Sequence, residues 1–203
     1  MKQLTRRLFL AIILGICSAF LLACGATQTK EALSSPSAKA AAPTTTSSKK
    51  ALVVYFSRSG KTQTVAQQIV DKLHANSVLI EASEPYSEVY HETTQRARRE
   101  LDTNAYPEIK PVNTKVSDYN VIFVGYPIWG GRAPRPVMTF LASQDFAGKT
   151  VVTFCTSGGS PISGSTPEIK AQIPNANVIE GIRAYPDNEN ATLKWLNSLE
   201  VLK

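Results

Sequence analysis

The hydrophobic positions after residue 50 fall into five short unbroken runs, separated by segments in which apolar residues have a helical spacing. An unbroken apolar run of this length is typical of a strand that is covered on both faces of a parallel sheet. The predicted strands cover residues 51–56, 77–82, 121–126, 150–155 and 177–182. Apolar residues three or four positions apart mark the intervening helices, namely Val65, Ile69 and Leu73; Val137, Phe140 and Leu141; Ile169 and Ile173; and Leu193, Leu196 and Leu199. The alternation predicts an α/β fold, a doubly wound five-stranded parallel sheet with helices on both faces, which binds ligands beyond the carboxyl ends of its strands.

The longest stretch without a predicted strand, residues 83–119, is charged and contains a predicted helix around Arg96. We expect a solvated helix that packs on the domain through Val89, Ala97 and Leu101. The alternative, in which the arginines of this helix hold a substrate, stays open.

The first fifty residues have a different pattern, in which a basic start precedes an apolar stretch at residues 8–22 that ends beside Cys24. The stretch is shorter than the ~20 residues of a membrane span. It resembles the signal peptides of bacterial lipoproteins, so we expect residues 1–23 to be removed and Cys24 to carry lipid, with an uncleaved anchor helix as the alternative. Residues 24–49, mostly Ala, Ser, Thr and Lys, predict a flexible linker behind the lipid anchor.

The paired Arg6 and Arg7, followed by Phe9 and Leu10, resemble the twin-arginine export motif. That route exports folded proteins with their cofactors, and the general secretory route is the alternative. Either route predicts an extracytoplasmic domain of a bacterial cell envelope, attached to a membrane by its lipid anchor.

The formal charge of +6 lies in the first fifty residues, which hold seven Lys or Arg and one acidic residue. The rest of the chain balances 15 basic side chains with 15 acidic ones. Binding to the phosphate backbone of a nucleic acid requires a basic surface. We therefore expect no nucleic acid among the partners of the domain.

Cys155 is the one cysteine of three that belongs to the predicted domain, and the two histidines, His74 and His91, are distant from it in sequence. A disulfide framework within the domain is therefore excluded, and these residues make a poor set of metal ligands, so we expect no metal. We interpret Cys155 as an inert buried thiol rather than a redox group, because it has no partner cysteine.

The first candidate binding site is the loop between the first strand and the following helix, formed by Ser57, Arg58, Ser59, Gly60, Lys61 and Thr62. N–H groups at a helix N-terminus attract an anion, hydroxyl groups add donors, and a glycine lets the backbone approach a phosphate closely. A polar turn capped by Ser59 is the alternative. A Walker loop is excluded because Tyr55 stands where its first glycine is required, and Ser160 lacks the closing glycine of a serine-hydrolase elbow.

Two further loops follow predicted strands. The loop after the third strand contains Pro127, Ile128, Trp129 and Gly130. Trp129 can supply the flat face on which a planar ring stacks, although a tryptophan of the core or its rim is an equal alternative. The loop after the fourth strand offers hydroxyl groups and backbone amides that suit the polar edge of such a ring, from Thr156, Ser157, Gly158 and Gly159.

Together these loops resemble those of the flavodoxin-like family. The positions that match its first-strand signature are Val53, Val54, Tyr55, Ser57, Gly60, Thr62, Ala66 and Ile69. The resemblance covers residues 50–203 and extends to members that are lipoproteins. It implies a flavodoxin-like fold with FMN as the cofactor, the phosphate in the first loop and the isoalloxazine ring lined by the second. Members often carry a second aromatic residue at the position of Gly130, which implies that one face of the ring is less covered here.

The resemblance implies a redox protein in which no side chain is required as an acid or base, because the flavin supplies the chemistry. We expect a carrier of electrons at the outer side of a bacterial membrane, acting with redox partner proteins or a small-molecule electron acceptor. An NAD(P)H-dependent FMN reductase of quinones or similar acceptors is the alternative, although no second nucleotide fingerprint is present. A non-redox FMN-binding module is a further alternative.

Overall fold

The computed structural model describes residues 50–202 of the chain. The predicted signal peptide, the lipidated Cys24 and the linker at residues 24–49 lie outside the described residues. Among the described residues, no helix combines the length and the apolar character that crossing a membrane requires.

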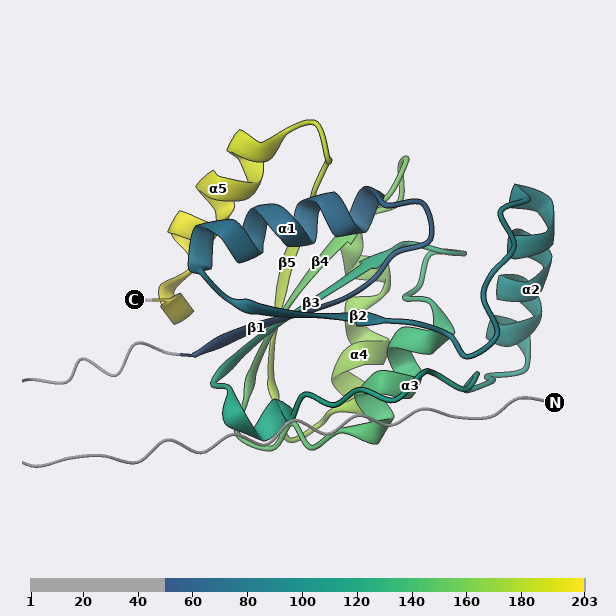
Figure 1. The fold of residues 1–203 in the computed structure, drawn as a ribbon, viewed down its shortest axis with the longest axis horizontal. Coiled ribbons are helices and arrows are strands. Elements are labelled where there is room, and N and C mark those ends of the chain that lie inside the picture. Colours follow the sequence, from purple (N-terminus) through teal and green to yellow (C-terminus); the bar gives the residue numbers. More distant parts are fainter. Residues whose placement is uncertain (1–49, 203) are drawn as a thin grey trace, which may run out of the picture. The chain divides into compact units, whose positions relative to one another are not determined.

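Five parallel strands form one sheet in the order β2-β1-β3-β4-β5, with helices on both faces (Figure 1). The strands are β1 (Ala51–Phe56), β2 (Asn76–Ile80), β3 (Val121–Pro127), β4 (Thr150–Thr156) and β5 (Asn177–Arg183). The helices of the described part are α1 (Lys61–Leu73), α2 (Tyr90–Asp102), α3 (Arg135–Ser143), α4 (Thr166–Gln172) and α5 (Glu189–Ser198). Short 3-10 helices cover Val116–Asp118, Ile162–Gly164 and Glu200–Leu202. The predicted fold is confirmed, and its strand order reverses between β1 and β3, where such sheets bind ligands.

The two faces of the sheet bury alternate residues of the central strands. In β1, Leu52, Val54 and Phe56 belong to the core that α3 and α4 cover, whereas Val53 and Tyr55 belong to the core with α1 and α5. This burial on both faces explains why the strands are unbroken apolar runs in the sequence.

The second strand ends earlier than the sequence predicts. β2 stops at Ile80, and Ala82 then forms an antiparallel bridge with Ile109 from the segment that returns toward β3. The N–H of Lys110 donates to the carbonyl of Glu81 at 2.8 Å. The end predicted at residue 82 is therefore wrong, because the returning segment replaces β1 as the backbone partner.

The helix predicted around Arg96 is α2, which stands at the carboxyl-end side of the sheet (Figure 1). Ala97 is buried and Leu101 is half-buried, as predicted, whereas Val89 is 54% exposed. The expected packing of Val89 is wrong because this residue precedes the first turn of α2 with an extended backbone, φ −75° and ψ 117°. It does not share the helical face of the other two residues.

Candidate functional site

The three predicted loops meet at one end of the sheet through Thr156, the last residue of β4. Its hydroxyl oxygen lies 2.9 Å from that of Thr62 in the first turn of α1, and both side chains are buried. Its carbonyl accepts the N–H of Ile128, which follows Pro127 at the end of β3, at 2.9 Å. The carboxyl ends of neighbouring parallel strands thus bring together loops that are distant in sequence.

Ser57 and Gly60 give the first loop the features of an anion site. Ser57 Oγ is buried and has no hydrogen-bond partner in the described part of the chain. Gly60 is the N-cap residue of α1 with a φ of 80°, a left-handed conformation that favours glycine, and no side chain caps the helix. The first N–H groups of a helix have no partner within it. A phosphate group fits here, because it accepts hydrogen bonds from amides and hydroxyl alike, whereas a turn capped by Ser59 is not what the chain forms.

The charged residues of this loop are directed elsewhere or lie at the surface. Arg58 Nη1 donates to the carbonyls of Ser87 and Glu88 at 3.3 and 3.2 Å, so its guanidinium group binds the segment before α2. Ser59 and Lys61 are exposed. The buried hydroxyl groups of this loop are therefore better placed as phosphate ligands than its cations are.

Trp129 in the second loop is held by two aromatic residues from outside that loop. Its ring centroid lies 5.4 Å from that of Phe56 and 4.9 Å from that of Tyr86, both in T-shaped contact. The N–H groups of Trp129 and Arg132 each donate to the carbonyl of the other residue at 3.0 Å, and the two glycines between them have positive φ. The half-buried Trp129 thus packs at the rim of the core, where part of its ring remains accessible for stacking.

The third loop is folded by the hydroxyl group of Ser157. Ser157 Oγ accepts the N–H of Gly159 at 3.2 Å and that of Ser160 at 2.8 Å. Arg183 at the end of β5 donates to the carbonyl of Gly159 at 2.5 Å. Because Gly158 and Gly159 are exposed, this loop presents backbone groups at the surface.

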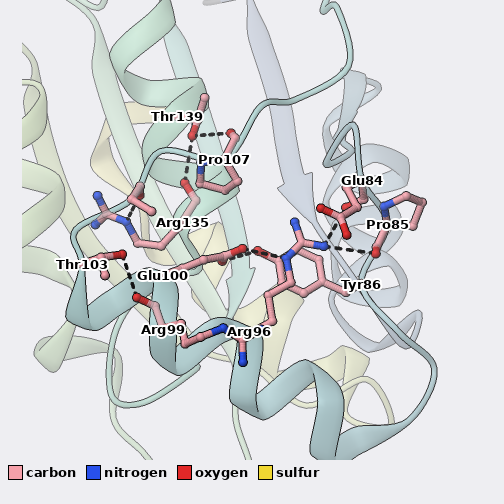
Figure 2. A network of polar contacts seen from close by, with 11 residues as sticks. Glu84, Pro85, Tyr86, Arg96, Arg99, Glu100, Thr103, Pro107, Arg135 and Thr139 are labelled. Carbon is pink, nitrogen blue, oxygen red and sulfur yellow. Dashed lines mark hydrogen bonds and ion pairs between the residues drawn. The ribbon is translucent and has the colours of Figure 1, made fainter.

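A charged network next to Trp129 could not be assigned from the sequence (Figure 2). Tyr86 donates its hydroxyl to Glu100 Oε2 at 2.5 Å, and Arg96 Nε donates to Glu100 Oε1 at 2.8 Å. The guanidinium group of Arg96 lies 4.0 Å from the centre of the Tyr86 ring and also donates to the carbonyl of Glu84 at 2.9 Å. Burial, followed by the hydrogen bond to Glu100, raises the pKa of Tyr86, so its phenol stays protonated at neutral pH. The four-residue spacing of Arg96 and Glu100 was the available sequence signal.

Residues 50–199 match the family model described as Flavodoxin. The chain belongs to the flavodoxin family. A comparison with curated protein sequences gave no match.

Solved structures similar to this flavodoxin domain include two candidate flavoproteins from Bacteroides. The protein from Bacteroides uniformis is 30% identical with a TM-score of 0.69, and the match covers 74% of this chain and 99% of that one. The protein from Bacteroides eggerthii is 32% identical with a TM-score of 0.64, with the same coverage of 74% and 99%. A flavoprotein from Lactobacillus acidophilus, solved in complex with FMN, is 27% identical with a TM-score of 0.62 and coverage of 73% and 99%. The match therefore covers almost the whole of each of these solved chains.

Membership of the flavodoxin family supports FMN as the cofactor. The residues present fit that group. Ser57 Oγ and the N-terminus of α1 suit a phosphate, and Trp129 on the neighbouring loop suits a planar ring. The roles of the individual residues in the three loops stay predictions.

A cavity of about 720 Å³ lies between α2 and the Trp129 loop of the flavodoxin domain. Arg58, Ile128 and Trp129 contribute to its wall from the predicted site, and Ala97 and Leu101 contribute from α2. Its volume is in the range of small-molecule binding sites. The favoured sequence interpretation, a solvated helix, did not place α2 at the site, whereas the alternative that stayed open gave its arginines a ligand, and Arg98 lines this cavity.

Cys155 in β4 is fully buried, as predicted. Burial raises the pKa of its thiol to about 12, against a smaller opposing effect of the Arg183 charge. The thiol therefore stays protonated at neutral pH, which agrees with an inert group.

Proposed function

We propose that this domain binds FMN and carries electrons with it at the outer side of a bacterial membrane. The proposal depends most on Ser57 Oγ, which is buried without a partner beside the N-terminus of α1. An unpaired buried hydroxyl is costly unless a ligand completes its hydrogen bonds. The FMN complex of the Lactobacillus acidophilus relative, 27% identical, supports the same cofactor here.

The residues of the site bind and orient the cofactor in this proposal. When bound, FMN supplies one- and two-electron redox chemistry. Ser57 and the N–H groups of α1 hold the phosphate, while Trp129 covers the ring. Phe56 and Tyr86 fix the orientation of Trp129 through their T-shaped contacts, and the bond from Tyr86 to Glu100 fixes Tyr86 in turn.

A second candidate function is an NAD(P)H-dependent reductase of quinones or similar acceptors. The cavity of about 720 Å³ beside Trp129 supports it, because the part of the wall that α2 provides lies outside the predicted FMN loops and offers room for an acceptor next to the ring.

FMN binding is tested on residues 50–203, because solved chains of similar extent support the expectation that such a domain folds by itself. The purified domain is loaded with FMN, freed of excess by gel filtration, and examined by its absorbance spectrum. We expect one flavin for each protein chain, and the absence of bound flavin would overturn the proposal. Rapid mixing with NADPH then distinguishes the two candidates, because fast bleaching of the flavin indicates a reductase and an unchanged spectrum indicates a carrier.

The location is proposed from the leader, with Cys24 as the lipid-bearing residue. Replacing Cys24→Ser in the full chain is expected to abolish incorporation of labelled palmitate and to leave the leader at residues 1–23 uncleaved, because cleavage of a lipoprotein leader follows lipidation of its cysteine. Two or three acyl chains bury methylene groups at ~0.8 kcal/mol each, which accounts for firm attachment. Cys17→Ser is the matched control and should change neither result. Equal labelling of the wild type and the Cys24→Ser variant would contradict the lipoprotein assignment.

A further inference from the structure

The helix α2 is attached to the domain differently from the other helices. Of the five α-helices in the described part of the chain, α2 is the one that contributes no residue to either core of the sheet. Its buried residues are Thr93, Ala97 and Glu100, two of which are polar. In contrast α1, which is also 13 residues long, contributes the fully buried Val65 and Ile69 to one core. Apolar packing therefore does little to hold α2 in place.

Polar contacts hold α2 instead (Figure 2). Its Glu100 accepts the hydroxyl of Tyr86 and pairs with Arg96 of the same helix. Arg96 in turn donates to the carbonyl of Glu84 at 2.9 Å, in an exposed hydrogen bond. Tyr86 belongs to the core and contacts Trp129, so these bonds connect α2 to the body of the domain. We call Tyr86, Arg96 and Glu100 the latch.

The two ends of α2 are held unequally. Beyond its C-terminus, Arg135 is 1% exposed and donates from Nε to the carbonyl of Ala105 at 2.6 Å. Asn104, between the helix and this anchor, has a φ of 50°, so the backbone leaves the helical path there. At the other end, Val89 has an extended backbone, and Tyr90 is 75% exposed. The C-terminal end of α2 is thus anchored in the protein, whereas its N-terminal end lies at the surface.

The cavity of about 720 Å³ has α2 on one side and the Trp129 loop on the other. We infer that α2 is a lid of this cavity, which swings open about its C-terminal anchor when the bonds of the latch break. Breaking a few polar contacts at the surface costs far less than unfolding the core, so such an opening is local. Because the cavity adjoins Trp129, the open lid admits FMN and the closed lid retains it. This last step rests on the proposed FMN function, whereas the opening itself does not.

Hydrogen exchange followed by mass spectrometry measures the opening on the purified full chain without FMN. Amides of a helix that opens locally exchange faster than those of a helix that opens only with the whole domain. The internal reference is α1, since it has the same length as α2. We expect the amides of α2 to exchange at least about tenfold faster than those of α1. Added FMN should slow the exchange of α2 by about tenfold or more, because it binds the closed form.

The substitution Tyr86→Phe tests the latch, because it keeps the ring beside Trp129 and removes the hydroxyl that Glu100 accepts. We expect exchange of α2 to become about tenfold faster while that of α1 stays unchanged, since the closed form loses a hydrogen bond to a charged group. Release of FMN, followed by the recovery of flavin fluorescence, should also become about tenfold faster. Tyr119→Phe is the matched control, since this buried tyrosine accepts one hydrogen bond from Asn76 Nδ2, at 2.8 Å, at the amino ends of the strands. The control should stay within about twofold of the wild type in both measurements.

The outcomes separate the lid from the proposed function. If the wild-type chain does not bind FMN, the proposed function is refuted, whereas exchange of α2 in the flavin-free chain still decides whether the lid opens. Equal exchange of α1 and α2 in that chain overturns the inference. So does equal acceleration of both helices by Tyr86→Phe, which indicates unfolding of the whole domain. If α2 exchanges faster in Tyr86→Phe but FMN is released at the wild-type rate, α2 opens without controlling the cofactor, and the inference is again overturned.

Discussion

Replacing Arg135→Met is expected to lower the free energy of unfolding of the domain by about 3–5 kcal/mol, because it leaves a partly buried carboxylate without its cation. Arg135 is 1% exposed and donates from Nη1 to Glu168 Oε1 at 2.8 Å. Its Nε donates to the carbonyl of Ala105 at 2.6 Å, and its guanidinium group lies 4.6 Å from the centre of the Tyr106 ring. Glu168 Oε2 is already buried without a partner, so the carboxylate has no other group to compensate its charge.

The same substitution is expected to loosen α2. Ala105 follows the C-terminus of α2 closely, and Arg135 at the start of α3 connects that segment to α4 through Glu168 (Figure 2 shows Arg135 beside the end of α2). Urea unfolding followed by circular dichroism measures the loss of stability. Arg132→Met is the matched control, since this exposed arginine lies three residues earlier and should change the stability by about 0.5 kcal/mol or less. Equal stability of the two variants would show that the buried ion pair contributes nothing.

Arg135 also shows where interpretation of the sequence ends. It stands between Pro134 and Pro136 at the start of a helix, a place where an arginine is ordinarily exposed. Its burial depends on Ala105 and Glu168, which are 30 and 33 positions away. No local pattern contains contacts of this kind, since they form only when α2, α3 and α4 are packed.

The strands, unlike the burial of Arg135, were predictable because they depend on a pattern of neighbouring residues. A strand buried on both faces needs apolar residues at every position, which is a local pattern. In β4, Val151 belongs to one core and Val152 to the other, and both are fully buried. β2 departs from its predicted end because the bridge between Ala82 and Ile109 is a contact between distant segments.

The candidate site also has a part that the sequence predicts and a part that it does not. The loops after β1, β3 and β4 could be grouped from the sequence, because parallel strands place their carboxyl ends together. The place of α2 beside these loops could not be predicted from the sequence in this way. The position of α2 depends on the contacts of Arg135 and on the hydrogen bond between Tyr86 and Glu100. Arg58 illustrates the difference, because its place in the loop suggested a phosphate ligand, whereas its guanidinium group binds the segment before α2.

Replacing Ser57→Ala together with Thr62→Val is expected to weaken FMN binding by at least about 100-fold, because each hydrogen bond to a charged group contributes about 1.5–3 kcal/mol. Ser57 Oγ has no partner in the described structure, so its removal costs the free protein no hydrogen bond. Thr62→Val keeps the shape of the side chain and removes its bond to Thr156. The stability of the free protein should fall by about 1–3 kcal/mol, because the buried Thr156 hydroxyl loses this partner.

Comparison of these two losses decides the role of the hydroxyl groups. FMN affinity is measured by the quenching of flavin fluorescence, and the stability of the free domain by urea unfolding. Thr64→Val is the matched control, since Thr64 lies in the same first turn of α1 but is exposed, and its hydroxyl donates to the carbonyl of Gly60 at 3.2 Å. It should leave FMN affinity within about twofold of the wild type.

If the double variant retains wild-type affinity, the phosphate does not bind at this loop, and the unpaired Ser57 hydroxyl must have another explanation. If affinity and stability fall together, the two hydroxyl groups support the fold rather than the cofactor. A large loss of affinity with little loss of stability is the result that a phosphate site at the N-terminus of α1 requires.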